Sequence, residues 1–204
     1  MSLTCGFFNS NNHDRLYNAT HFNKMFDGII TDGIFNNVGN CFGVTSGNGM
    51  EVLVGTGRAW LEDTWTLIED ESYPLSIDIA PALSTNTRID AVVITVDTSD
   101  NVRDNTVEIV KGAEFTTGTA DVLPILASNQ HPIAYIRVKS GTTVMTDNLI
   151  TNVVGGSASD AKPGTPWVTS PLVSGGGGST ITTSYGKTLP SKGTEGQVFI
   201  LLEE

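Results

Sequence analysis

The side chains of this chain best suited to chemistry are carboxylates that gather in short segments. Asp97, Asp100 and Asp104 lie close together, but the calcium-binding loop with its central glycine and closing glutamate is absent. A pair such as Glu62 and Asp63 would serve a glycosidase only if the fold held two carboxylates opposite each other across a groove. We interpret both groups as hydrated turn residues, and a hydrolase of bacterial cell walls is one alternative function.

Histidine, cysteine and serine show no arrangement that catalysis or metal binding requires. Cys5 and Cys41 are too few and too far apart for a metal site or a disulfide framework, so we expect buried free thiols. The three histidines share no zinc-ligand spacing, and the glycine run 175–178 lacks the Lys-Ser/Thr pair of a phosphate-binding loop. No serine or cysteine lies in the local frame of an activated nucleophile. We therefore expect no catalytic, cofactor-binding or metal-binding residue, and a protein that is not an enzyme.

The charge balance argues against two classes of ligand. The chain carries 22 acidic and 11 basic residues, a formal net charge of −11, and no cluster of Lys and Arg. Nucleic acids and anionic lipids both need basic residues to displace counterions, so we expect neither as a ligand. No apolar run is long enough to span a membrane, and the first residues lack the layout of a secretion signal. We expect a chain that is synthesised in a cytoplasm and does not insert into a membrane.

The three tryptophans are the residues most able to contact a sugar. An indole ring offers a flat apolar face, and acidic or amide side chains beside it can bind hydroxyl groups. Trp60, Trp65 and Trp167 are therefore candidate glycan contacts, and a carbohydrate-binding module that recognises host cell-wall glycan is the main alternative function. The competing interpretation is that these rings fill a core or an interface.

The stretch from Asn18 to Ile30 is the only one with a helical pattern. Phe22, Phe26 and Ile29 recur at three- and four-residue spacing and form one apolar stripe, while Asn18 can accept hydrogen bonds from the first turn. A helix this short is not stable alone in water. We expect the stripe to pack on the β-rich remainder of the chain or at a subunit interface, so its three residues are candidate interface residues.

The chain from residue 42 onward has the pattern of a β-domain. Short apolar runs alternate with turn signals about every ten residues, which is typical of a sandwich. Residues 89–96 are the most apolar run and predict a central strand buried on both faces. Residues 133–138 predict another strand, with 144–150 returning beside it. We therefore predict a mainly β fold in which an N-terminal α-helix packs on a β-sandwich or barrel-like domain.

The composition changes at residue 155. Residues 155–188 are rich in Gly, Pro, Ser and Thr and hold few large apolar side chains, which predicts a linker or extended arm. A last strand follows, in which Phe199 and Leu201 share one face; it needs a neighbouring strand from this domain or from another chain, so both are candidate interface residues. We expect a helix plus β-domain over residues 1–154 and a Gly/Pro/Ser-rich arm over 155–204.

Several patches of the sequence also carry a resemblance. A Tyr-Asn pair opens the helix, Gly-Ile-Phe closes it, a Gly-Met pair precedes a strand, and Gly-x-Ala-Trp and Arg-Ile-Asp follow in order. Over about residues 5–154 this series resembles the start of tail and baseplate proteins of tailed phages and prophages of Gram-positive bacteria. The matching residues are Asp14 to Asn18, Phe22, Phe26, Asp32 to Phe35, Phe42 to Thr45, Gly49 to Val54, Gly57 to Trp60, and Arg88 to Asp90.

The resemblance implies a structural role in the virion. It implies a receptor-binding or adaptor component of a tail or baseplate that docks into a symmetric assembly as a homo-oligomer, with a trimer favoured. Other tail and baseplate proteins would be its partners, a host surface polysaccharide a further one, and the bacterial host cytoplasm its place of synthesis. The low charge and the apolar residues near the chain start suit a protein that buries surface against copies of itself and its neighbours.

Overall fold

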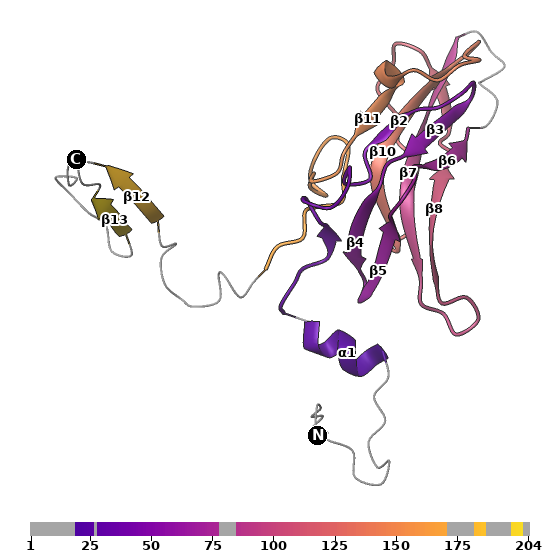
Figure 1. Cartoon of the computed structure of the whole chain (residues 1–204). Coiled ribbons are helices and arrows are strands. Elements are labelled where there is room, and N and C mark those ends of the chain that lie inside the picture. The colour runs from indigo at the N-terminus through magenta and orange to yellow at the C-terminus, as the bar shows by residue number, and fades with distance from the viewer. Residues whose placement is uncertain (1–18, 27, 78–84, 171–181, 187–196, 202–204) are drawn as a thin grey trace.

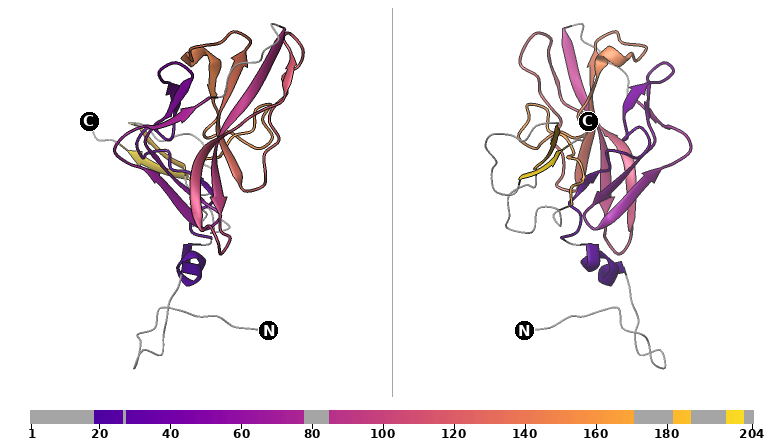
Figure 2. Two further views of the ribbon diagram at one scale, coloured as in Figure 1. Left: turned by 90° about the vertical axis from the view of Figure 1, so that its right-hand side faces the viewer. Right: turned by 60° about the vertical axis from the view of Figure 1, so that its left-hand side comes forward.

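The computed structural model describes residues 19–26, 28–77, 85–170, 182–186 and 197–201 (Figure 1). Within these residues the protein is mainly β, with a single α-helix and several antiparallel sheets. Two layers of strands pack on each other around a shared apolar core, and the sheets do not close into a barrel (Figure 2). The predicted mainly β fold with an N-terminal helix is confirmed, and the barrel-like alternative is wrong.

The first layer is one long, bent hairpin with two flanking strands. Its strands are β1 (Gly33–Ile34), β2 (Val44–Ser46), β3 (Glu51–Val54), β4 (Gly57–Leu61), β5 (Thr64–Ile68) and β6 (Tyr73–Ser76). β3 and β4 form one arm, and β5 and β6 form the other. Breaks at residues 55–56 and 69–72 divide the arms into two three-stranded sheets, in the orders β2-β3-β6 and β1-β4-β5.

The second layer is a five-stranded antiparallel sheet. Its strands are β7 (Asn86–Asp97), β8 (Asp104–Val110), β9 (Glu114–Thr116), β10 (Gln130–Lys139) and β11 (Ile150–Asn152). The order is β11-β10-β7-β8, and β9 pairs with the start of β7. β10 contains the strand predicted at residues 133–138. The return strand predicted at 144–150 is wrong in its bounds, because a short 3₁₀ helix η1 (Asp147–Leu149) precedes the shorter strand β11.

β7 is buried on both faces, as its apolar run predicts. Its even-numbered residues from Val92 to Val96 face the core between the layers. Its odd-numbered residues from Ile89 to Val93 face a second, smaller cluster on the outer side of the sheet. A strand placed between two apolar environments needs apolar residues at every position, which explains its near-continuous run. The second cluster consists of Ile89, Ala91, Val93, Phe115 and Tyr135.

Two residues of β7 itself form a buried ion pair. Arg88 Nε donates to Asp90 Oδ1 at 2.9 Å and to Oδ2 at 3.0 Å, and both side chains are almost completely buried. Asp90 Oδ1 also accepts from Gly112 N at 3.0 Å. A buried charge is tolerated when it is paired and hydrogen-bonded. Only glycine allows the main chain at position 112 to come this close to β7, because a Cβ at this position would lie 1.9 Å from the carbonyl oxygen of Ile89.

An asparagine side chain bridges the two layers at each of two seams. At one seam Asn152 of β11 bonds the main chain of Val44 in β2: Val44 N donates to Oδ1 at 2.7 Å, and Nδ2 donates to Val44 O at 2.9 Å. Asp147 Oδ1 accepts from Ser46 N beside it at 2.7 Å, and its hydrogen bonds from Ser46 lower the pKa of this carboxyl. At the other seam Asn105 of β8 bonds β5. Edge strands that face each other are thus joined by asparagine side chains, and Asn152 bonds the main-chain N–H and C=O of Val44 as a neighbouring strand would.

Residues 155–169 pack on the β-domain. Thr165 donates from both N and Oγ1 to the carbonyl oxygen of Pro132 in β10, at 3.0 and 2.8 Å, and its side chain is buried. Ile34 and Trp167 form a parallel β-bridge that extends the β1-β4-β5 sheet. The β-domain therefore extends past the boundary predicted at residue 154, to about residue 169. Sequence composition did not reveal this, because the segment is held by main-chain hydrogen bonds and few large apolar side chains.

The helix α1 (Ala19–Phe26) is shorter than predicted, by four residues at its end. Gly28 adopts a left-handed conformation, and the amides of Ile29 and Ile30 both turn back to the carbonyl oxygen of Phe26. This is how helices commonly end at a glycine. Phe26 contacts the ring of Trp60, with centroids 5.4 Å apart, whereas Phe22 does not enter the core and is 46% exposed. Asn18, the predicted N-cap, lies outside the described residues.

The last predicted strand is present as β13 (Gln197–Leu201). It pairs in parallel with β12 (Thr182–Gly186), so that Phe199 lies opposite Ser184 and Leu201 opposite Gly186. Sequence analysis assigned β12 to the linker and missed it, because its residues apart from Tyr185 are small or polar. Cys5 and the glycine run 175–178 lie outside the described residues, and Cys41 is a half-buried free thiol.

Two shortened chains test the position of the domain boundary. A chain that ends at Ser170 is expected to keep the melting temperature of the β-domain, whereas one that ends at Val154 loses Thr165, Trp167 and the strand-like bridge to β1. We expect the second chain to melt at least several degrees lower, since a loss of about 1 kcal/mol shifts the melting temperature by about 2–4 °C for a domain of this size. Equal melting temperatures in differential scanning calorimetry would contradict the extended boundary.

The Asn152 seam makes a second prediction. Asn152→Ala removes both partners of the Val44 main chain, and we expect it to lower the free energy of unfolding by about 1–3 kcal/mol, measured by urea denaturation. Asn101→Ala, in the exposed turn between β7 and β8, is the matched control and should change the stability by less than about 0.5 kcal/mol. A similar small effect for both variants would show that the seam does not stabilise the sandwich.

Candidate functional site

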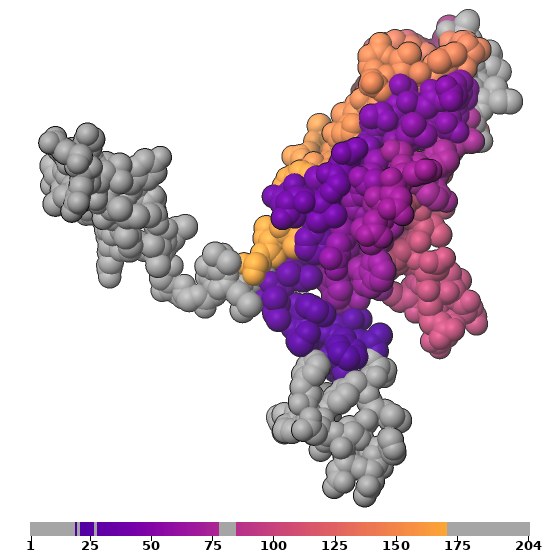
Figure 3. All heavy atoms as spheres, in the orientation of Figure 1, coloured from indigo at the N-terminus to yellow at the C-terminus, as the bar shows by residue number. Residues whose placement is uncertain are grey.

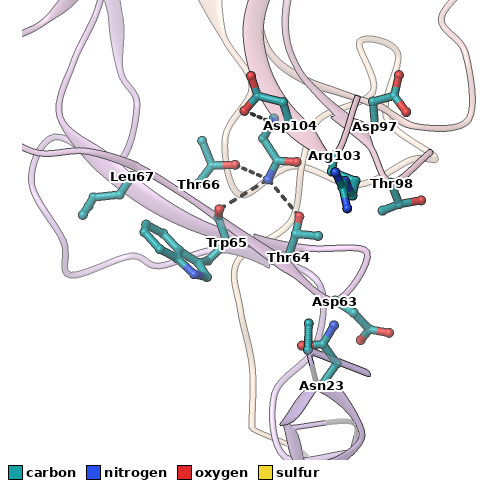
Figure 4. A pocket seen from close by; sticks show the side chains of 12 residues that line it. Asn23, Asp63, Thr64, Trp65, Thr66, Leu67, Asp97, Thr98, Arg103 and Asp104 are labelled. Carbon is teal, nitrogen blue, oxygen red and sulfur yellow. Dashed lines mark hydrogen bonds between the residues drawn. The ribbon is translucent and has the colours of Figure 1, made fainter. Parts of the chain in front are cut away.

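An open groove of about 690 Å³ lies where α1, β5 and the turn between β7 and β8 meet. In the space-filling view the β7–β8 turn projects beside α1, and the surface is hollowed between them (Figure 3). The groove combines aromatic, amide, hydroxyl and carboxylate side chains (Figure 4). Its lining residues are Ala19, Asn23, Asp63, Thr64, Trp65, Thr66, Leu67, Asp97, Thr98, Arg103, Asp104 and Asn105.

β5 supplies the centre of the groove and presents two chemically different faces. Its side chains alternate, as in any strand: Trp65 and Leu67 point outward, and Thr64 and Thr66 point toward the second layer (Figure 4). Trp65 is 61% exposed, which is unusual for an indole ring on a well-formed strand. β5 is also an edge strand of its sheet, so the groove runs along an edge that no other strand covers among the described residues.

Asn105 of β8 holds this edge in place. Its Nδ2 lies 2.8 Å from Thr64 Oγ1 and 2.9 Å from Thr66 Oγ1, and 3.3 Å from the carbonyl oxygen of Trp65. One amide group therefore donates to three acceptors on successive residues of β5. Because β8 belongs to the second layer, this contact fixes the position of β5, and of Trp65 within it, relative to the β7–β8 turn. Sequence analysis missed Asn105, and the only signal for it was the polar, inward-facing pair of threonines.

Two strained turns shape the ends of the groove. Glu62 and Asp63, which join β4 to β5, both have positive φ angles, 48° and 61°. This is the backbone of a two-residue hairpin turn whose preferred residues are Asn and Gly. Arg103, in the β7–β8 turn, also has a positive φ, 49°. Left-handed backbone at residues other than glycine is costly, and it concentrates at positions that the surrounding structure determines.

The groove is acidic. Among its lining residues are the carboxylates of Asp63, Asp97 and Asp104, and Arg103 is the one side chain there with a permanent positive charge. The side chain and main chain of Ser99 donate hydrogen bonds to Asp97 and lower the pKa of its carboxyl, so this group stays ionised in mildly acidic solution. The local potential therefore has the same sign as the whole chain, and anions are repelled.

A histidine and a glutamate meet beside this end of the sandwich. His131 Nε2 of β10 lies 3.0 Å from Glu62 Oε1 in the β4–β5 turn, and both side chains are partly exposed. The amide of Glu62 also donates to Asp32 Oδ2 at 3.2 Å. These contacts join the hairpin turn to the second layer and to the segment before β1. Across the part of the chain that the structure describes, no group of three or more His, Cys, Asp and Glu residues could hold a metal ion.

The structure separates the three candidate tryptophans. Trp60 and Trp65 lie opposite each other on β4 and β5, but Trp60 is 9% exposed and contacts Phe26. Trp167 is half-buried against the main chain of Gly155, where a Cβ would lie 2.2 Å from its Nε1. Trp65 alone of the three is widely exposed, and it lines the groove. Trp60 and Trp167 therefore pack against other parts of the protein, and Trp65 is the most exposed of the three indoles.

The candidate interface residues also differ in their positions. Phe22 and Phe26 share the helical stripe, but Phe26 packs on Trp60 and Phe22 is exposed. Ile29 follows the helix and is half-buried. Phe199 and Leu201 lie far from α1 in the sequence. Their strand, β13, pairs with β12 in a two-stranded sheet that is separate from the sheets of the β-domain. The structure does not bring the two groups into one site.

Comparisons with known proteins give no relative. No family model matches the chain, and no curated protein sequence or solved structure is significantly similar to it. None of the described helices is long and apolar enough to cross a membrane. The class of protein that the fold defines is therefore a mainly β sandwich with an N-terminal helix, and its function has to be inferred from the surface described above.

The left-handed backbone at Arg103 predicts a stabilising substitution. Arg103→Gly removes a side chain that its conformation disfavours, and we expect the free energy of unfolding to rise by about 0.5–1 kcal/mol. Val102→Gly, at the preceding exposed position of the same turn, is the control, because Val102 has no positive φ and glycine there adds only chain entropy. Urea denaturation of the two variants should show opposite changes; a loss of stability in both would mean that Arg103 is not strained.

Proposed function

We propose that this chain is a structural, non-catalytic component of the tail or baseplate of a tailed phage or prophage. In this proposal it docks into a symmetric assembly as a homo-oligomer, most simply a trimer, beside other tail and baseplate proteins. Two lines of support combine: the sequence patches that resemble such proteins, and the surface of α1. The helix surface is the observation that carries the docking role.

α1 presents apolar side chains on more than the side that touches the sandwich. It has eight residues and projects from one end of the β-domain (Figure 1). Phe26 contacts Trp60, yet Phe22 and Met25 are 46% and 40% exposed. A helix of two turns is not stable by itself in water, and one aromatic contact buries only part of its apolar surface. A second protein surface that covers Phe22 and Met25 would complete its burial.

Two of the patches that carry the resemblance, Asp32 to Phe35 and Gly57 to Trp60, lie in the part of the fold next to this helix. Gly33 and Ile34 form β1, and they pair with Trp60 and Ala59 of β4, the strand that contains the Gly-x-Ala-Trp patch. The helix, β1 and β4 are thus one contiguous unit at the end of the sandwich that carries α1. This arrangement supports an assembly role for that end of the molecule, since its residues connect the helix to the β-domain rather than form a catalytic group.

Removal of the exposed apolar groups of α1 tests the proposal. We expect the double substitution Phe22→Ser and Met25→Ser to abolish self-association of the full chain, measured by light scattering coupled to size-exclusion chromatography. The melting temperature of the β-domain should change little, because neither side chain is in its core. Val102→Ser and Val144→Ser, both at exposed apolar positions elsewhere, are the matched controls and should keep the oligomer.

The proposed presence of the chain in the virion can be tested by a separate measurement. Tail particles purified from the bacterium that carries the gene are expected to contain the chain, detected by mass spectrometry in a constant ratio to the other tail proteins. A chain that is monomeric at micromolar concentration, and that is absent from such particles, would contradict the proposal. A chain that assembles only when its neighbouring tail proteins are present would be consistent with it.

A further inference from the structure

The edge of β5 that faces away from β4, called the free edge below, carries main-chain groups that no strand pairs with among the described residues. β4 and β5 are joined by a two-residue turn, and Leu61 lies opposite Thr64 across it. In such a hairpin the two residues that flank the turn exchange hydrogen bonds, and hydrogen-bonded and non-bonded pairs alternate beyond them. The N–H and C=O groups of Trp65 and Leu67 therefore point toward the free edge.

Neighbouring contacts agree with this alternation. Arg58 lies opposite Leu67, and its carbonyl oxygen points away from β5, because it accepts from Phe35 N at 2.9 Å. On the free edge, Asn105 Nδ2 lies 3.3 Å from the carbonyl oxygen of Trp65, which has a second lone pair. Within the described part of the chain, the amide of Trp65 and both main-chain groups of Leu67 have no hydrogen-bond partner. These groups are available to an added strand.

The same arm of the hairpin is protected at β6 but not at β5. β6 is also an edge strand, and its Pro74 has no N–H group to offer to a neighbour. β5 contains neither proline nor a charged residue, which are two common devices against unwanted pairing. The part of the arm that is open to strand pairing is therefore β5.

Acidic residues at both ends of β5 restrict which strand can pair with it. Asp63 precedes the strand, and Glu69, Asp70 and Glu71 follow it; all four are exposed. Two copies of β5 placed edge to edge would bring acidic ends together, whether they ran parallel or antiparallel. Like charges opposite each other destabilise a strand pair. A second copy of this chain is therefore a poor occupant, and a basic strand is a better one.

The two sides of an added strand would meet different surroundings. Trp65 and Leu67 present their side chains on the outer side of the sheet (Figure 4). On the side toward the second layer, the β7–β8 turn contributes Asp97 and Asp104 to the groove, and Arg103 is the one guanidinium among the lining residues. Alternate side chains of a strand point to opposite sides. The outer positions of the added strand would thus meet apolar groups, and the inner positions would meet carboxylates.

We propose that the free edge of β5 binds an extended segment of a partner protein, in which apolar side chains alternate with basic ones. The segment adds a strand to the β1-β4-β5 sheet, with its apolar side chains beside Trp65 and Leu67 and its basic ones toward Asp97 and Asp104. In this mode of recognition the main chain supplies affinity and the alternate side chains supply specificity. The inference does not rest on the docking role, because it uses the edge of β5 rather than the exposed side of α1.

The edge is held in position before a partner arrives. Asn105 Nδ2 lies 2.8 Å from Thr64 Oγ1 and 2.9 Å from Thr66 Oγ1, so both inward-facing threonines of β5 are tied to β8. The net charge of −11 also attracts a basic segment at long range. A strand that is already fixed loses little conformational entropy when it pairs, which favours binding.

The experiment uses the full chain and a peptide of four Lys-Val repeats, acetylated and amidated, beside a peptide of four Glu-Val repeats. We expect calorimetric titration to detect binding of the Lys-Val peptide, weaker at high salt, and no binding of the Glu-Val peptide. Leu67→Pro should weaken binding by about tenfold or more, because it removes an N–H of the free edge. Leu67→Val keeps this N–H and is the matched control, with an affinity within about twofold of the parent chain.

Hydrogen exchange gives a second readout that needs no variant. In the free chain, the amides of Trp65 and Leu67 should exchange quickly, and those of Thr66 and Ile68, which face β4, slowly. The Lys-Val peptide should slow exchange at Trp65 and Leu67 by about tenfold or more and change it little at Thr66 and Ile68. NMR spectroscopy resolves these four amides individually.

Three results would overturn the inference. The first is no binding of the Lys-Val peptide at millimolar concentration. The second is equal binding by folded Leu67→Pro and Leu67→Val, or unchanged exchange at Trp65 and Leu67, which would show that charge alone holds the peptide. The third is loss of self-association in Leu67→Pro without peptide binding by the parent chain, which would assign the edge to a second copy.

The double substitution in α1 separates this inference from the docking role. It should keep peptide binding while losing self-association, because neither side chain lies on the free edge of β5. Failure of the docking role and failure of strand addition are therefore distinguishable.

Discussion

Burial of β7 on both faces is the constraint on which the rest of the structure depends. One face of this strand requires the first layer as a cover, and the other requires the second cluster around Phe115 and Tyr135. The strand therefore lies inside the protein along most of its length, and its neighbours β8 and β10 are positioned by pairing with it. The buried pair of Arg88 and Asp90 adds an electrostatic constraint, because both charges are almost completely buried and each neutralises the other.

The two layers leave open edges, and the protein uses these edges in different ways. At the β2–β11 edge, Asn152 forms two main-chain hydrogen bonds and closes the seam. At the β5–β8 edge, Asn105 bonds β5 but does not cover it, and the groove remains beside Trp65. A hydrogen-bonded asparagine side chain thus stabilises the sandwich at one edge and shapes a surface groove at the other. Exposed edge strands commonly require such protection against unwanted pairing.

Much of the fold could be predicted from local patterns. The continuous apolar run at residues 89–96 predicted a doubly buried strand, and the turn signals predicted a β-sandwich, because both depend on side-chain periodicity. The helix was predicted in type but not in length, since Gly28 ended it earlier than the apolar spacing indicated. The packing of residues 155–169 was not predictable from composition, because main-chain hydrogen bonds, as at Thr165, leave little trace in the sequence.

The features of the candidate site were likewise only partly predictable from the sequence. The sequence by itself determined that the chain carries three indole rings, an excess of carboxylates and no catalytic or metal-binding motif, because these are properties of residue type and spacing. Only the tertiary structure decided that α1 buries Trp60, that Gly155 receives Trp167, and that Trp65 is exposed beside Asn105. The reason is physical: exposure and proximity depend on which distant segments pack together, and no local pattern encodes the contact between β5 and β8.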